Sequence, residues 1–162
     1  MKQNKAFTLI EVLIAISIFV VVITIVLSLF SAAIRGYRKV IAMQNVQENA
    51  RFLLEFMTKE IRMSTISSYT QNTLNIVRSD NQAVAYVFSG GKLLRTSPSS
   101  SGAISSEEVF ISGRFYAEGI GAGDNLQPKV TIMMSVEGIG AKIEEKAKIN
   151  LQTTLSQRLI DL

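Results

Sequence analysis

The chain divides into three stretches by the spacing of its hydrophobic and polar residues. Residues 12–34 contain no Asp, Glu, Lys or Arg, and Leu, Ile, Val and Phe fall on every side of a helix built from them. Such a helix would be ~34 Å long at 1.5 Å per residue, enough to cross the ~30 Å hydrocarbon core of a bilayer. Since a single segment in lipid satisfies its own backbone groups only as a helix, we predict a membrane-spanning helix.

The second stretch predicts that this helix continues beyond the membrane. Residues 35–63 contain no proline. Apolar residues recur there at spacings of three and four, at Val46, Ala50, Leu53, Met57 and Ile61. Charged and amide side chains fill much of the remaining surface, which makes the helix amphipathic. We expect the apolar stripe to pack on the protein's own sheet, and the polar residues 64–72 to end the helix.

Beyond residue 73 the hydrophobic period changes to two, which predicts strands. Apolar residues alternate over 74–76, 84–88 and 130–136, and residues 92–96 and 108–116 also have strand character. A long final strand is predicted over 143–155. Gly90-Gly91 predicts a hairpin turn, whereas residues 97–106 and 119–125 are loops by composition. We therefore predict an α+β fold. One long N-terminal helix, half transmembrane and half amphipathic, packs on a C-terminal antiparallel meander of five or six strands.

The amino-acid composition excludes several classes of catalytic and metal-binding site. The chain is 48% hydrophobic with a mean hydropathy of +0.28, much of it concentrated in the first stretch. It contains no Cys and no His, which excludes disulfides, thiol catalysis, cysteine-based zinc sites and Ser–His hydrolases. The net charge of +4 is mild, and basic residues do not alternate with aromatic ones, so there is no clear nucleic-acid site.

Acidic residues give no candidate active site. Glu107–Glu108 and Glu144–Glu145 are neighbours in sequence, and neighbours on a strand point to opposite faces of the sheet. The glycine-rich segment 119–125 holds a single acid, Asp124, which is too few for a calcium loop. We expect no enzyme, no metal site and no cofactor.

Three simple interpretations of residues 12–34 have to be considered: a cleaved secretory signal, a buried core helix and a generic membrane anchor. A cleaved secretory signal would have an apolar core of about 7–15 residues. This run is longer, and its approximate cleavage site, residues 31–33, comes late. A buried core helix would usually be shorter. A generic single-pass anchor explains everything except Glu11, since a carboxylate deeper in lipid is costly without a partner.

The residues around Glu11 closely resemble the class III signal of type IV pilins and pseudopilins. Lys2 and Lys5 precede Ala6, which stands where that family usually has Gly, and the string Phe7-Thr8-Leu9-Ile10-Glu11 follows. The resemblance implies that a prepilin peptidase cuts between Ala6 and Phe7, and that Phe7 is then N-methylated. It also implies that Glu11 neutralises the α-amine of a neighbouring subunit and thereby sets the axial register, as buried polar residues do in coiled coils.

A weaker similarity links residues 47–62 to the larger minor pseudopilins and minor pilins, the J type of type II secretion and the W type of pili. The organisation it implies is a leader at 1–6, a transmembrane assembly helix at 7–34, its amphipathic continuation at 35–66, and a β-rich pilin domain at 67–162. The function it implies is that of a minor subunit of a type IV pilus or a type II secretion pseudopilus, near the tip or as an assembly primer.

The same resemblance implies partners and a location. The partners are other pilin or pseudopilin subunits through the N-terminal helix, the prepilin peptidase, the inner-membrane assembly platform and the lipid bilayer. The protein would cross the inner membrane once with its C-terminal domain outside the cytoplasm, an orientation that the basic residues on the two sides of the span do not decide. The alternative is a single-pass, membrane-anchored β-rich binding domain that does not polymerise.

Overall fold

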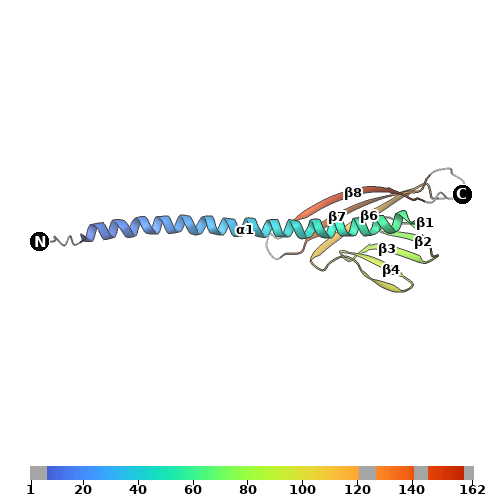
Figure 1. Ribbon diagram of the computed structural model, residues 1–162, viewed down its shortest axis with the longest axis horizontal. Helices are drawn as coiled ribbons and strands as arrows, with labels where there is room; N and C mark the ends of the chain where they lie inside the picture. The colour runs from blue at the N-terminus through green and yellow to red at the C-terminus, as the bar shows by residue number, and fades with distance from the viewer. Residues whose placement is uncertain (1–6, 121–126, 141–145, 159–162) are drawn as a thin grey trace. The chain divides into compact units, whose positions relative to one another are not determined.

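One long helix is followed by strands in the computed structural model, which describes residues 7–120, 127–140 and 146–158 (Figure 1). The helix α1 spans Leu9–Arg62. The described strands are β1 (Ser64–Tyr69), β2 (Thr73–Arg78), β3 (Ala83–Ser89), β4 (Lys92–Ser97), β5 (Ser100–Ala103), β6 (Val109–Glu118), β7 (Lys129–Gly138) and β8 (Lys148–Ser156). The first five form one antiparallel sheet in chain order, and β6, β7 and β8 form a second. The α+β fold and the meander are confirmed.

Two strands are present where the sequence predicted none. The helix ends at Arg62, but residues 64–69, expected only to end it, pair with β2 as strand β1 with an irregularity between Ile66 and Ser68. Within the predicted loop 97–106, residues 100–103 pair with β4 as β5. All four residues of β5 are exposed, so no apolar alternation marks it in the sequence. The expectation of five or six strands was too low for this reason.

The chain divides into two compact units, Met1–Arg38 and Lys39–Leu162, and α1 contributes to both. In the first unit every described side chain is exposed, and an 18-residue window of α1 has a mean hydropathy of 3.2 with none of it buried. By length and composition α1 can therefore cross a membrane. This half of α1 is not buried by the rest of the described chain, unlike the core helix that was the alternative.

The second unit has one core between the helix and the two sheets. The buried residues of α1 are Val46, Ala50, Leu53, Met57 and Ile61, the stripe that the sequence predicted. Strands β6 and β7 bury alternate residues against it. The apolar stripe of the helix therefore packs against strand faces on which every second residue is buried. Burial of these apolar side chains is the main stabilising contribution to the unit.

Two aromatic rings join the sheets. Phe88 on β3 stacks on Phe115 of β6 with ring centroids 4.8 Å apart. Gly113 makes room for this contact, because a Cβ there would lie 2.5 Å from the Phe88 ring. Directly after β3, Gly90 and Gly91 have φ of 59° and 75° and form the predicted two-residue hairpin turn.

The end of β8 returns to the end of the helix. The fully buried side chain of Gln157 accepts a hydrogen bond through Oε1 from the backbone N–H of Ile66, at 3.1 Å. The backbone N–H of Arg158 donates to the carbonyl oxygen of Arg62 at 3.2 Å. These bonds close the core where α1 passes into β1.

Glu60 ties α1 to three strands of the first sheet. Its carboxylate accepts two hydrogen bonds from Arg95 on β4, from Nε to Oε2 at 2.9 Å and from Nη2 to Oε1 at 2.6 Å. The Tyr86 hydroxyl on β3 donates to Oε2, and Nε of Arg78 on β2 lies 3.6 Å from Oε1. The side chains of Glu60 and Arg95 are only 14% and 16% exposed, so this bidentate pair is largely shielded from water.

The same contacts fix the ionisation of the cluster. Burial raises the pKa of Glu60, but the hydrogen bonds from Arg95 and Tyr86 and the positive charges of Arg95 and Arg78 outweigh burial and hold it below its ordinary value. Burial and the hydrogen bond to Glu60 raise the pKa of Tyr86. The hydrogen bond to Glu60 also raises the pKa of Arg95. The carboxylate and the guanidinium are therefore both charged at neutral pH.

We expect Glu60→Gln to lower the free energy of unfolding by about 1–3 kcal/mol at neutral pH, because Arg95 would keep its charge and lose its partner. The pKa of Glu60 is lowered on folding, so its stabilisation is present above the ordinary value of 4.5 and is lost as the pH falls through the folded value. The difference between the wild type and the variant should therefore shrink below pH 4.5. Denaturant unfolding followed by circular dichroism measures it.

The matched control is Glu55→Gln, the same change at an exposed position of the same helix. It should alter stability by less than about 0.5 kcal/mol at every pH. A Glu60→Gln deficit that stays constant down to the lowest pH would contradict the assigned ionisation.

Candidate functional site

The first turn of α1 is closed by a reciprocal pair of side chains, Thr8 and Glu11. The Oε2 atom of Glu11 accepts hydrogen bonds from the backbone N–H of Thr8 at 2.9 Å and from its hydroxyl at 2.8 Å. The backbone N–H of Glu11 in turn donates to Oγ1 of Thr8 at 3.3 Å. This is a capping box, in which two backbone donors that a helix start leaves unpaired are satisfied by side chains.

The capping role of Glu11 was missed from the sequence. A Thr followed by Glu three residues later, directly before an apolar run, is the sequence signature of such a box, and Thr8 and Glu11 have that spacing. The carboxylate therefore already has a structural role within its own chain.

Phe7 lies just outside the helix and next to this box. Phe7 and Thr8 are non-helical, and Phe7 is 85% exposed. Together with Val12, Ala15 and other residues up to Phe19, Phe7 and Glu11 line an open groove of about 490 Å³ on the helix surface. Among the described residues that line this groove, Glu11 is the one charged residue and the others are apolar, so a cation that approached them would meet a single defined anion. Ala6, the other residue of the expected cleavage site, lies outside the described residues.

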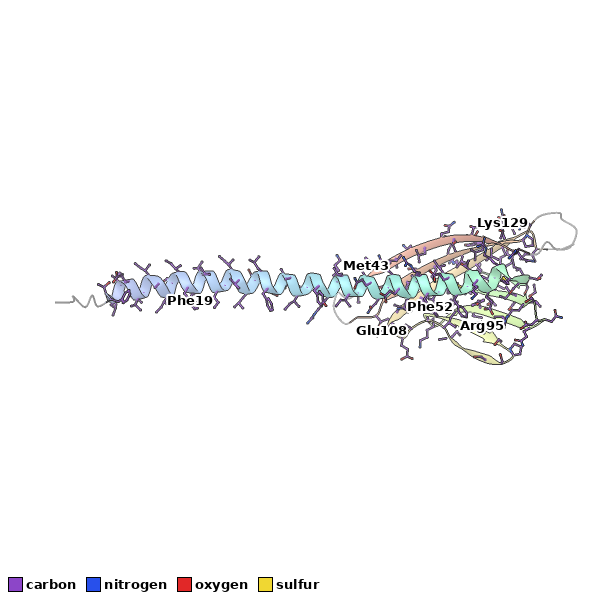
Figure 2. All side chains as sticks on the ribbon, in the orientation of Figure 1. Phe19, Met43, Phe52, Arg95, Glu108 and Lys129 are labelled. Carbon is purple, nitrogen blue, oxygen red and sulfur yellow. The ribbon has the colours of Figure 1, made fainter. Side chains whose placement is uncertain are left out.

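The first half of α1 presents apolar side chains around this site on all sides. Phe19 is 63% exposed, and many other large apolar residues in this half of the helix are also exposed (Figure 2). The hydroxyls of Ser17 and Thr24 donate to the carbonyls four residues earlier, Leu13 and Val20, at 2.8 Å each. Since these hydroxyls are satisfied within the helix, the surface they leave suits lipid or another apolar helix.

The structure brings together no other cluster with catalytic character among the described residues. Glu107 forms an exposed ion pair with Lys92 at 3.5 Å. In the described part of the chain no three His, Cys, Asp or Glu residues are grouped as metal ligands. Asp124, Glu144 and Glu145, the other acids that the sequence analysis considered, lie outside the described residues.

Comparison with known proteins gives one result for the N-terminal segment. Residues 1–27 match the family model of the prokaryotic N-terminal methylation motif. No curated protein and no solved structure matches the chain. The matched segment includes Phe7, Thr8 and Glu11 and therefore covers the whole capping box and the start of the exposed apolar helix.

We expect Thr8→Val to speed amide hydrogen exchange in the first turn of α1 by about twofold to thirtyfold. The substitution keeps the side-chain shape but removes the hydroxyl of the cap, and losing a cap costs about 0.5–2 kcal/mol. Exchange at Glu11 and Val12, whose N–H groups donate to Oγ1 and the carbonyl oxygen of Thr8, measures the effect by NMR on the full chain in detergent micelles. Ser17→Ala removes a hydroxyl within the helix and should leave this turn unchanged. Equal acceleration by both variants would show that the box does not close the helix.

Proposed function

We propose, from the N-terminal methylation motif at residues 1–27, that the chain is a minor pilin or pseudopilin of the type IV pilin-like family. In this proposal a prepilin peptidase cleaves between Ala6 and Phe7 and methylates the new N-terminus. The mature chain then joins a type IV pilus or a type II secretion pseudopilus, at or near the tip or as an assembly primer. The methylation motif, followed directly by the exposed apolar half of α1, is the observation that carries the proposal.

The chemistry of assembly follows from the position of the cut. Removing residues 1–6 takes away Lys2 and Lys5, which lowers Lys plus Arg from 17 to 15 against 13 acids and the net charge from +4 to +2. It also creates an α-amine on Phe7, one residue before Thr8. In a low-dielectric environment a free amine and a free carboxylate are each costly, and pairing them across two subunits removes both penalties. Glu11 would then select one axial position of an incoming subunit.

The capping box makes this pairing compatible with an intact helix. One oxygen of Glu11, Oε2, accepts both bonds from Thr8. The other oxygen, Oε1, is therefore the atom we assign to the α-amine of the neighbour. Both Thr8 and Glu11 lie after the proposed cut, so the helix keeps its cap when the leader leaves.

The rest of the proposal concerns where the subunit lies and which proteins act on it. The apolar half of α1 anchors the subunit in the inner membrane with the β-rich domain outside the cytoplasm, and later packs against other subunits. The prepilin peptidase and the inner-membrane assembly platform act on it there. No catalytic role is assigned, because pilin-type subunits are structural and the chain has no Cys or His.

We expect the membrane form of the protein to begin at Phe7, with a mass increased by one methyl group. N-terminal peptide mass spectrometry of the protein purified from membranes of its own host measures this directly. Ala6→Gly should be cut at least as completely as the wild type, because it restores the usual small residue. Ala6→Leu should accumulate uncut, because the larger side chain does not fit a site selective for small residues.

Two results would contradict the proposed processing. A chain that still begins at Met1 would leave an anchored binding domain as the better interpretation. A chain that begins at Ile34 would identify a secretory signal. Neither result would depend on whether a filament is visible.

Glu11 variants separate the charge of this residue from its capping role. We expect Glu11→Gln, which keeps an oxygen acceptor for Thr8 but loses the charge, to insert into the membrane normally and to be recovered in sheared filaments about tenfold less than the wild type or worse. Glu11→Ala loses the cap as well and should be impaired to at least the same degree. The readout is the ratio of filament-bound to membrane-bound protein.

Thr8→Val is the matched control, since it weakens the cap and keeps the carboxylate. It should assemble better than Glu11→Gln. If Glu11→Gln assembles normally and Thr8→Val does not, Glu11 acts through the helix cap and the pairing role is wrong.

A further inference from the structure

A groove follows α1 on the side of β8 in the unit Lys39–Leu162. It consists of two open hollows of about 790 and 830 Å³ that share Leu54 and Glu55. Helix residues form one wall, and residues of β8 with the two that follow it form much of the other. The groove borders the core, since Ala50 and Gln157 line it, and it does not include the residues of the site at Glu11.

One end of the groove carries three basic side chains that have no acidic partner among the described residues. Lys59 and Arg62 lie one turn apart at the end of α1, and Arg158 is joined to Arg62 by the backbone hydrogen bond described above. None of the three forms an ion pair with an acid of the described residues. Three cations stand against one acid, Glu55, in this hollow. The helix dipole accounts for the two cations on α1 but not for Arg158, which lies outside the helix.

The rest of the groove suits an extended chain with apolar side chains. Leu54, Ile149 and Leu151 are half-buried along its floor. Among the described strands β8 pairs only with β7, so its second edge is open. An added strand would place alternate side chains toward the groove and find backbone partners on that edge.

We propose that this groove binds an extended, acidic segment of another polypeptide, whose carboxylates contact Lys59, Arg62 and Arg158. The proposal goes beyond the assembly role, because it requires neither cleavage at Ala6 nor polymerisation. A nucleic acid fits less well. The second hollow holds Glu48 and Glu55 against Arg51, which would repel a continuous phosphate chain, and no aromatic side chain lines either hollow among the described residues.

The test uses the full chain in nanodiscs of zwitterionic lipid, with empty nanodiscs as background. The probe is a fluorescein-labelled, end-blocked octapeptide of alternating leucine and glutamate, and binding is measured by fluorescence anisotropy. We expect it to bind more tightly than the same peptide with glutamine or lysine in place of glutamate. Arg158→Glu should weaken binding by about twofold to fivefold or more, the range for one exposed ion pair. Lys59→Glu, Arg62→Glu and Arg158→Glu together should weaken it by about tenfold or more.

The matched control is Arg114→Glu, the same charge reversal at an exposed position of β6 that does not line the groove. It should bind as the wild type does, and unfolding profiles should confirm that every variant is folded. Equal weakening by Arg114→Glu, equal affinity for the lysine peptide, or no binding of the acidic peptide would overturn the proposal. So would tighter binding of an oligothymidylate of equal charge that is lost in the triple variant, since that would identify a nucleic-acid site.

Discussion

A single helix has to be stable in two different surroundings, and the rest of the structure depends on that constraint. In its first half α1 exposes apolar side chains on every side, and only lipid or other apolar surfaces remove them from water. In its second half one stripe is buried by the protein's own sheets, and the outer side is mainly polar but also exposes Phe52 and Phe56. The domain thus occupies the apolar stripe of the second half, while the first half remains available to lipid or to neighbouring helices.

Apolar packing alone would leave the helix free to shift along the sheets, because burial is non-directional. Glu60 supplies the directional contact. Its two bonds from Arg95 hold α1 at one axial position relative to β4, and the Tyr86 hydroxyl adds a contact to β3. Burial of the carboxylate opposes this arrangement, but the hydrogen bonds and nearby cations outweigh that cost. The cluster therefore sets the register of the helix and the stripe provides most of the stability.

The sequence predicts those features that have a local signal. The buried stripe from Val46 to Ile61 was found because its spacing matches the helical period, and the Gly90-Gly91 turn because its residues adopt positive φ. Strand β5 is wholly exposed and has no such signal, and no period reveals the division into two sheets or the Phe88–Phe115 contact that joins them. At the candidate site the motif identified Phe7 and Glu11 as residues of interest, whereas the cap at Thr8, although its spacing is present in the sequence, was recognised from the hydrogen bonds. The Glu60 cluster joins residues 26 and 35 positions apart, beyond the reach of any local pattern.

The contact between Gln157 and Ile66 has a consequence for the order of folding. The two residues are 91 positions apart, and the Gln157 side chain is wholly enclosed. The core beside the end of α1 is therefore incomplete until residue 157 has been synthesised and has reached the same compartment. Local pieces such as the β3–β4 hairpin can form earlier, but long-range closure comes last and sets the pace. A chain that is exported as it is made would thus lack this closing contact until residue 157 has also crossed the membrane.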